Sequence, residues 1–443
     1  MNFRYLCTMN RRILGIAIPA IIANITVPLL GLIDLSIAGH LGSAECMGAI
    51  AVGSMMFSLV YQNFGFLRMG TSGITAQAYG SKDMRAAAVT LLRAALLALA
   101  IGIAILLMQY PLQWLVLLAI GPSPEVLHLA QSYFFICVWG APAILLMMSI
   151  KGWLLGMQDS RSPMVISISV NVANVIASIT AVYILKMGFI GIAFGTLVSE
   201  YIGLGIALFI IVRRHRGILR NASLAETLKR GTLGRFFSVN RDIFLRSVCL
   251  MTVTLSFTAI GARSGDLILA TNAMMMQMFL LISYFMDGFA FAGEALVGRY
   301  CGAQDYSTLH RCIRYLFGWG CVVMAVFAIA YGFFAPQIFG ILTDDADVIA
   351  TATIYRLWCI AIPIASMAGF VWDGVFIGLT ATRGMLVSIA VACVSFYTLN
   401  IFPLYCGTHS NDWLWLAFVV YLAMRGIVQT IYYITRLRND TSS

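Results

Sequence analysis

Two stretches of this 443-residue sequence, KGWLLGMQDSR at residues 151–161 and DGVFIGLTATR at residues 373–383, follow one pattern. Their shared residues lie 222 positions apart: Gly152 and Gly374, Gly156 and Gly378, Arg161 and Arg383. The same separation relates other pairs along the chain: Gly39 and Gly261, Phe57 and Phe279, Gly80 and Gly302, Asp83 and Asp305, Tyr133 and Tyr355, Cys137 and Cys359. Chance matches would not keep one register over so many segments, so the sequence predicts two related halves.

The composition is that of a membrane protein. Hydrophobic residues make up 61% of the chain and charged residues 10%, whereas soluble domains are about 45–50% apolar and about 25% charged. Apolar stretches of about 20 residues, the length that crosses a bilayer, lie at 13–38, 47–73, 86–110, 126–149, 163–184, 188–212, 243–262, 267–293, 311–334, 350–372, 384–404 and 413–434. Membrane barrels show short alternating segments instead. We therefore predict an all-α integral membrane protein with twelve transmembrane helices in two pseudo-symmetric six-helix lobes.

The predicted domains are an N-terminal six-helix lobe at 1–212, a basic cytoplasmic linker at 213–241 and a C-terminal six-helix lobe at 242–443. Because each half has an even number of spans, both halves start from the same side of the membrane and the repeat is parallel. Transporters with parallel repeats bind substrate between the halves and rock one against the other. The linker forms either an amphipathic helix on the anionic inner leaflet or a solvated tether.

Basic residues are concentrated in every second connection between the spans. Examples are Arg11, Arg12, Lys82, Arg85, Lys151, Arg161, Arg213, Arg214, Arg216, Arg235, Arg299, Arg311, Arg383, Arg436 and Arg438. The alternate connections contain few, and the one at 332–350 is acidic. Since positive charge marks the cytoplasmic side, we expect both termini to be cytoplasmic. The net charge of +10 then reflects topology, and we expect no nucleic-acid partner.

The first span contains ANITVPLLGLIDLSIAGHLG at residues 23–42, with one acid, Asp34. Pro28 removes a backbone donor and its ring crowds the carbonyl of Asn24, which predicts a kink or hinge. A buried carboxyl group disfavours its charged form, so Asp34 could gain and lose a proton during transport. The residue 222 positions later is Ser256. We predict a proton-coupling role for Asp34; a hydrogen-bonded structural acid is the alternative.

Three polar residues share one face of the fifth span. Asn171, Asn174 and Ser178 are spaced at i, i+3 and i+7, which places them along one side of a helix. Their amides and hydroxyl can hydrogen-bond a carboxyl group. We predict that they support the proton and substrate site together with Asn24 of the first span, and a polar contact between helices is the alternative for the fifth-span residues.

The second half offers further acids at membrane depth: Asp287, Glu294 and Asp373. Each is a secondary candidate for ion coupling, because charges there are costly. Structural pairing is favoured for two of them, Glu294 with Arg299 and Asp373 with Arg383. Asp242, in NRD at 240–242, is expected to cap a helix N-terminus. No role is predicted for Glu200 or Arg68.

The sequence contains no GxxxxGK[ST] phosphate loop and no HExxH metal motif. We therefore expect a transporter driven by an ion gradient rather than an enzyme, with neither cofactor nor metal.

Several stretches resemble the multidrug and toxic compound extrusion (MATE) family, and specifically its DinF-like branch. They are NITVPLLGLIDLSIAGHLG at 24–42, FLRMGTSGITAQAYGSKD at 66–83, GWLLGMQDSRSP at 152–163, NRDIFLRS at 240–247, MDGFAFAGEALVGRYCGA at 286–303 and DGVFIG at 373–378. The resemblance implies a V-shaped fold of two six-helix lobes that exchanges inward protons or sodium ions for outward organic compounds, often cations.

The resemblance also assigns roles to residues. It implies that Asp34 is the protonation site and that its protonation is linked to bending at Pro28. The family's fifth-span motif places an aspartate where this chain has Ser178. Because a sodium site with two carboxylates then lacks one of them, protons are favoured over sodium.

The expected function is efflux of small organic substrates by alternating access, driven by the proton motive force. The expected location is the inner (plasma) membrane of a bacterium, with membrane lipids as partners and no obligate protein partner. The alternatives are a sodium-coupled exporter, a flippase for lipid-linked precursors and, from a different class, an intramembrane enzyme.

Overall fold

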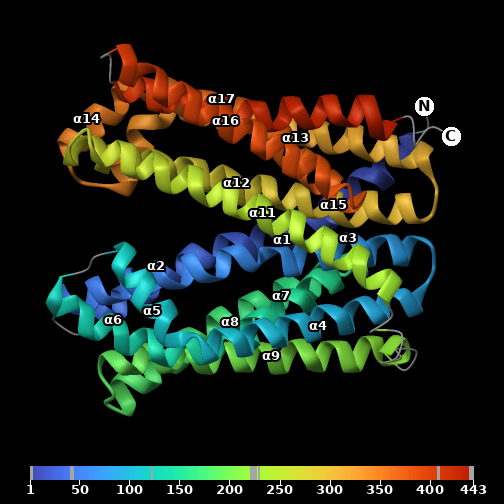
Figure 1. Cartoon of the computed structure of the whole chain (residues 1–443), viewed down its shortest axis with the longest axis horizontal. Coiled ribbons are helices and arrows are strands. Elements are labelled where there is room, and N and C mark those ends of the chain that lie inside the picture. Colours follow the sequence, from blue (N-terminus) through green and yellow to red (C-terminus); the bar gives the residue numbers. More distant parts are fainter. Residues whose placement is uncertain are drawn as a thin grey trace. The chain divides into compact units, whose positions relative to one another are not determined.

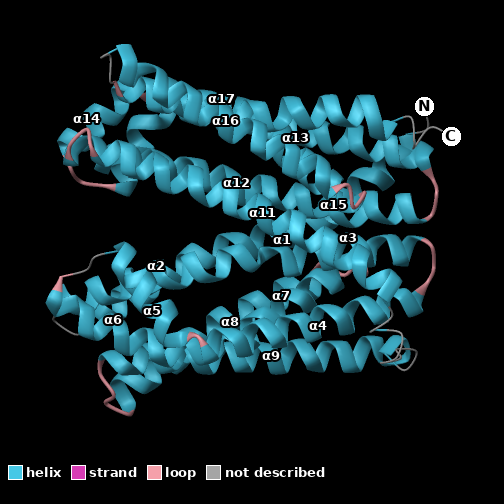
Figure 2. Ribbon diagram, viewed as in Figure 1, coloured by secondary structure: helices cyan, strands magenta, loops and turns pink. Residues whose placement is uncertain are grey.

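The computed structural model describes residues 3–39, 44–120, 123–219, 227, 230–406 and 410–438. Within these ranges the regular structure is helical and contains no strand (Figure 2). Twelve of the helical segments described are long and apolar enough to cross a membrane. The prediction of an all-α protein with twelve spans in two six-helix halves is therefore confirmed.

The helices of the first half are α1 (Phe3–Gly39), α2 (Ala44–Tyr61), α3 (Phe66–Gly80), α4 (Met84–Leu107), α5 (Gln109–Ile120), α6 (Pro124–Cys137), α7 (Ala141–Gly156), α8 (Arg161–Ile179) and α9 (Phe189–Leu219) (Figure 1). Short turns join some of these into one span. The 3₁₀ turn η1 (Gln62–Gly65) joins α2 to α3, and η2 (Val138–Gly140) joins α6 to α7. A π-helical turn, η3 (Thr180–Ile184), extends α8.

The helices of the second half are α11 (Arg230–Ala262), α12 (Asp266–Gly302), α13 (Tyr306–Leu342), α14 (Ala346–Ile354), α15 (Arg356–Gly378), α16 (Thr382–Cys406) and α17 (Asn411–Tyr432), which continues into η4 (Tyr433–Leu437). The basic segment 213–241 is helical at both of its ends, since α9 reaches Leu219 and α11 begins at Arg230. Residues 220–226 and 228–229, in its middle, lie outside the described part.

Contacts divide the chain into two compact units. The N-terminal unit is Ile22–Asn240, and the C-terminal unit combines Met1–Ile21 with Arg241–Ser443. Helix α1 thus contributes to both units. Its first part packs in the C-terminal unit, where Arg12 donates a hydrogen bond of 2.9 Å to the Tyr300 hydroxyl. The change of unit occurs six residues before Pro28.

The internal repeat is reproduced in close helix contacts within each unit. A Cβ atom on Gly152 would lie 2.2 Å from the carbonyl oxygen of Arg68, and one on Gly374 would lie 2.2 Å from that of Ala290. Arg68 and Ala290 are themselves 222 positions apart. These glycines are needed because α7 and α15 lie almost against the backbones of α3 and α12, as small residues allow in membrane bundles.

The turns repeat in the same register. The carboxylate of Asp83 caps α4 by accepting from the Ala86 amide at 2.8 Å, and that of Asp305 caps α13 by accepting from the Thr308 amide at 3.0 Å. The preceding residue of each turn, Lys82 or Gln304, has a positive φ of 61° or 56°. The two halves therefore share backbone geometry as well as sequence pattern.

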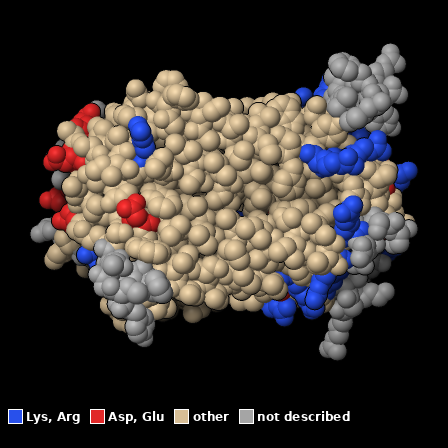
Figure 3. All heavy atoms as spheres, turned by 90° about the horizontal axis from the view of Figure 1, so that it is seen from above, with Lys and Arg blue, Asp and Glu red and all other residues tan. Residues whose placement is uncertain are grey.

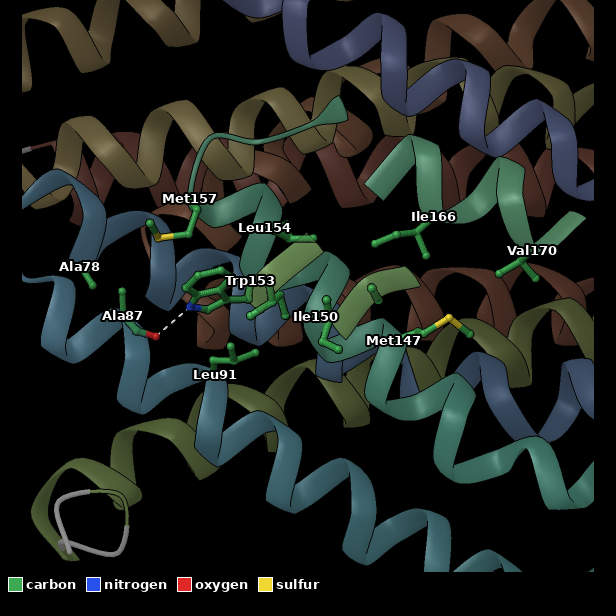
Figure 4. Close-up of a cluster of buried hydrophobic side chains, with 12 residues drawn as sticks. Ala78, Ala87, Leu91, Met147, Ile150, Trp153, Leu154, Met157, Ile166 and Val170 are labelled. Carbon is green, nitrogen blue, oxygen red and sulfur yellow. Dashed lines mark hydrogen bonds between the residues drawn. The ribbon is translucent and has the colours of Figure 1, made fainter. Parts of the chain in front are cut away.

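One core cluster of the N-terminal unit is formed by hydrophobic residues of α3, α4, α7, α8 and α9 (Figure 4). Trp153 is fully buried in it, and its indole Nε1 donates a hydrogen bond of 2.8 Å to the carbonyl of Ala87. The ring of His215 contacts Trp153 edge-on, with centroids 5.0 Å apart. Helix α9 is kinked at His215, whose φ and ψ of −123° and 16° are not helical.

Two sequence assignments need correction. The sequence pattern predicts Lys151 in the connection after the fourth span, but α7 continues to Gly156, so Lys151 lies inside the helix. Asp242 was expected to cap a helix, but it lies within α11, 1% exposed, where it accepts hydrogen bonds from Arg241 at 3.0 Å and Thr382 at 3.1 Å. Both helices thus extend past the apolar stretches that mark them.

We expect Gly152→Ala to destabilise the protein by about 1–3 kcal/mol, as overpacking of a core does, because its Cβ would overlap the Arg68 carbonyl. The midpoint of thermal unfolding of the purified protein measures this effect. Gly205→Ala is the control, since no atom lies within 4 Å of its Cβ position and alanine favours helix. Equal midpoints for the two variants would contradict the close packing of α3 and α7.

Candidate functional site

Asp34 points into the N-terminal unit from the last turns of α1. It is 8% exposed, whereas its neighbours Ile33 and Leu35 are 37% and 38% exposed. Ile37 and Ala38, three and four residues later, lie on the same face and join a hydrophobic cluster with residues of α2, α6 and α9. Helix periodicity and this apolar contact turn the carboxyl group inward.

The wall facing Asp34 is formed by α6 and α9. Tyr133 and Cys137, both on α6, lie close enough to Asp34 to interact with it electrostatically. The Tyr133 hydroxyl also lies beside the hydroxyl of Thr196, on α9. Gly53, on α2, leaves room for the tyrosine ring, because a Cβ atom there would lie 2.5 Å from Tyr133 Cδ1.

The fifth-span residues join the same cluster through Thr196. The Nδ2 atom of Asn174 donates a hydrogen bond of 3.1 Å to Thr196 Oγ1, which in turn donates to the carbonyl of Ile192 at 3.1 Å. Asn174 is 1% exposed and Ser178 is fully buried, and Asn171 is half-buried on the same face of α8. The structure thus links Asn174 to Asp34 through Thr196 and Tyr133.

Several polar atoms of this cluster have no hydrogen-bond partner among the described residues. They are Asp34 Oδ1, the Tyr61 hydroxyl, Asn171 Nδ2, Asn174 Oδ1 and Ser178 Oγ. Buried polar atoms are normally paired, and each exception calls for an explanation. Polar atoms that lack a partner around a buried carboxyl group can hydrogen-bond to water or to a polar group of a ligand, and the carboxyl group itself can bind a proton.

Glu200 lies next to this cluster on α9. Its side chain is beside Gly140, at the break between α6 and α7, and it interacts electrostatically with Tyr61 and with Lys151 on α7. Both charged side chains are half-buried. No sequence pattern indicates this pair, because Lys151 lies directly after the fourth apolar stretch and Glu200 lies within the sixth.

Helix α1 passes through Pro28 without interruption, and the proline side chain is exposed. Asn24, one turn before it, is half-buried. Arg68 takes part in the tight α3–α7 contact through its backbone carbonyl.

Asp373, in the C-terminal unit, is neutralised by two arginines. Its Oδ2 atom accepts hydrogen bonds from Arg246 on α11 and from Arg425 on α17, the latter at 2.6 Å, and Gln429 donates to Oδ1 at 2.8 Å. All four residues are at most 6% exposed. The expected pairing of Asp373 with a base is correct, but Arg383 is not its partner.

The other second-half candidates have different surroundings. Glu294 is 1% exposed on α12, and its carbonyl oxygen would lie 3.1 Å from a Cβ on Gly378. Asp287, also on α12, interacts electrostatically with Arg425. Ser256, the counterpart of Asp34, lies 3.0 Å from the Tyr397 hydroxyl. The acid of the first half is thus replaced by a hydroxyl pair in the second.

No group of three or more His, Cys, Asp or Glu residues within the described ranges could hold a metal ion. An apolar groove of ≈ 550 Å³ between α15 and α17 contains no acid. The open polar atoms around Asp34 therefore make the N-terminal cluster the strongest candidate site in the described structure.

Comparisons with known proteins agree with the division of the chain into two related halves. The MatE family model matches residues 19–180 and 243–405, once in each half. DNA damage-inducible protein F of Escherichia coli (strain K12) is 36% identical over 440 residues, which cover 99% of this chain and 95% of that protein. A probable multidrug resistance protein NorM of Photorhabdus laumondii is 22% identical over 361 residues, covering 79% of this chain and 78% of that protein.

Solved structures share the fold. The crystal structure of MATE in the bent conformation superposes with a TM-score of 0.87 at 18% identity, covering 98% of this chain and 97% of that one. The outward-facing conformation of a multidrug resistance MATE family transporter also has a TM-score of 0.87, at 19% identity, covering 97% of this chain and 96% of that one.

The fold, the family match and the relatives together define a multi-pass membrane transporter built from two related halves, not an enzyme. More specifically, the chain belongs to the MatE family of multidrug and toxic compound efflux transporters.

We expect Asp373→Ala to destabilise the protein by about 3–5 kcal/mol, because it leaves two buried arginines without their shared carboxylate. Thermal unfolding of the purified protein measures this loss. Asp412→Ala is the control, since its exposed carboxylate accepts only one hydrogen bond described, from Trp358 at 2.8 Å, and should change stability by about 1 kcal/mol or less. Similar losses in both variants would contradict the role of the buried cluster.

Proposed function

We propose that this protein is a secondary active antiporter that exchanges inward protons for outward small organic compounds by alternating access. The observation that carries the proposal is the contrast between two buried acids. Asp373 is neutralised by Arg246 and Arg425, whereas Asp34 has a buried carboxylate oxygen without a partner among the described residues. Of these two, Asp34 alone can change its charge without leaving an unpaired arginine behind.

Asp34 is the proton-coupling residue in this proposal. When deprotonated, it attracts a cationic or hydrogen-bonding substrate from the cytoplasm to the cluster of Asn171, Asn174 and Ser178. When protonated from the outside, its carboxyl group loses its charge and becomes a hydrogen-bond donor. Substrate and proton then compete for one set of polar groups.

Pro28 is the proposed hinge, with Asn24 beside it. A proline inside a helix removes one backbone hydrogen bond, so bending there costs less than elsewhere. Its position supports this role, because α1 changes from the C-terminal to the N-terminal unit at residues 21 and 22. Bending of α1 at this point would move Asp34 relative to the part of the helix held by Arg12 and Tyr300.

Protons are favoured over sodium by the ligands available. Sodium is a hard cation that prefers several oxygen ligands including carboxylates, as calcium and magnesium do. The position that would supply a second carboxylate is Ser178. The proton gradient is also sufficient: about 2.3 kcal/mol per 100 mV and about 1.4 kcal/mol per pH unit support an outward gradient of roughly 10² to 10³ for a neutral substrate.

The proposed location is the inner membrane of a bacterium, with both termini in the cytoplasm. On the face drawn in Figure 3, most Lys and Arg side chains lie toward one end of the helices and the Asp and Glu side chains toward the other. This segregation supports the orientation, because positive charge is retained on the cytoplasmic side. The bacterial relatives from Escherichia coli and Photorhabdus support the bacterial assignment.

A transport assay tests the coupling. Proteoliposomes containing a fluorescent organic cation are given either a pH gradient or a sodium gradient, and movement of the cation is followed. We expect the pH gradient to drive transport by the wild type and Asp34→Asn to reduce it to the level of empty liposomes, since the amide cannot exchange a proton. Ser256→Ala, at the equivalent position of the second half, should retain transport.

Other outcomes point to the alternatives. Transport driven only by sodium would replace the proton in the proposal with sodium. Equal rates for Asp34→Asn and the wild type would eliminate Asp34 as the coupling residue. Movement of a lipid-linked precursor in place of the organic cation would favour the flippase.

A further inference from the structure

A pocket of ≈ 410 Å³ lies between α8 and α9 of the N-terminal unit, away from the candidate transport site. These two helices pack along one another (Figure 1). The pocket lies at the beginning of α8 and near the end of α9, and its lining includes Arg161, Arg213, Arg214, Val165, Phe209 and Ile210. It therefore combines three cations with an apolar wall.

The charges in the pocket are not balanced within the described structure. Arg214 donates to Asp159 Oδ2 at 3.2 Å and to Ser162 Oγ at 3.1 Å. Asp159 also accepts from the Ser162 amide and hydroxyl at 3.0 Å and 2.6 Å, so its acceptor capacity is largely used. Arg161 and Arg213 have no ion-pair partner among the described residues. Two positive charges are thus available to an anion.

The apolar part of the pocket faces outward. Phe209 and Val165 are 60% and 45% exposed, and the guanidinium of Arg213 lies 5.7 Å from the centre of the Phe209 ring. This cation–π contact places the Arg213 guanidinium between the Phe209 ring and the other arginines at the end of α9. Exposed apolar residues directly below a cluster of arginines match the boundary between acyl chains and headgroups of a bilayer.

We propose that this pocket binds the phosphodiester headgroup of an anionic phospholipid from the adjacent leaflet, with an acyl chain lying along Phe209 and Val165. Arg161 and Arg213 contact the phosphate, and Arg214 remains paired with Asp159. Planar guanidinium groups suit phosphate oxygens, and basic pockets between membrane helices bind such headgroups on the cytoplasmic side. The proposal requires the helix ends to be cytoplasmic but does not depend on proton coupling.

The second half provides a matched control. The positions 222 residues after Arg161 and Arg214 hold Arg383 and Arg436, but Arg213 and Asp159 correspond to Thr435 and Ala381. Arg436 contacts the ring of Tyr432 at 5.6 Å. Removing Arg383 and Arg436 therefore changes the charge of an equivalent helix end by the same amount without altering the pocket.

Native mass spectrometry of the detergent-purified full-length protein tests the proposal. Phosphatidylglycerol and phosphatidylcholine with identical acyl chains are titrated into the wild type, the double variant Arg161→Ala/Arg213→Ala and the control Arg383→Ala/Arg436→Ala. At about 1 kcal/mol per arginine, or roughly fivefold in affinity, we expect the pocket variant to lose about 25-fold in phosphatidylglycerol affinity. Wild type and control should bind one phosphatidylglycerol in preference to phosphatidylcholine.

Three results would overturn the proposal. The first is equal affinity of the wild type for the two lipids, a measurement that needs no variant to fold. The second is an equal loss in the pocket and control variants, which would indicate a general attraction to basic helix ends. The third is displacement of the bound lipid by millimolar inorganic phosphate, which would assign the pocket to a soluble phosphate anion.

Discussion

A charged side chain inside a bilayer costs about 2.5–3.5 kcal/mol on insertion scales. The two units of this protein differ in how they surround their buried acids. In the C-terminal unit, Asp373 is enclosed by Arg246, Arg425 and Gln429 from two other helices. Such a closed network ties α11, α15 and α17 together, because removing any partner leaves a buried charge. In the N-terminal unit, Asp34 has no such partner among the described residues, and its Oδ1 atom is buried without a hydrogen bond.

The two units differ in their polar side chains but share the same backbone geometry. Glycines at equivalent positions bring α7 against α3 and α15 against α12, and capping aspartates and left-handed residues recur in the same register. The polar side chains do not repeat: Asp34 corresponds to Ser256, and Lys151 corresponds to Asp373. One scaffold thus supports a cluster with open polar atoms in one half and a closed ionic network in the other.

Much of the fold was predictable, because membrane insertion imposes simple rules on sequence. The length of apolar stretches gave the spans, and the 222-residue register gave the two halves. The candidate site was predictable only in part. Asp34, Asn174 and Ser178 stand out as polar residues in apolar helices, but Tyr133 and Thr196, which link them, are ordinary residues for a membrane helix. Lys151 and Asp242 were misplaced, because helix ends buried in protein do not show as apolar.

The sequence by itself determined the helical class, the number of spans, the internal repeat and the identity of the acids at membrane depth. These properties depend on hydropathy and spacing along one chain, which local residues fix. Only the tertiary structure decided which acid is paired, since Arg246 and Arg425 are 127 and 52 positions from Asp373. It also decided that Arg161 and Arg213 share a pocket, because the partners of a charge depend on which helices pack side by side, and spacing within one helix does not contain that information.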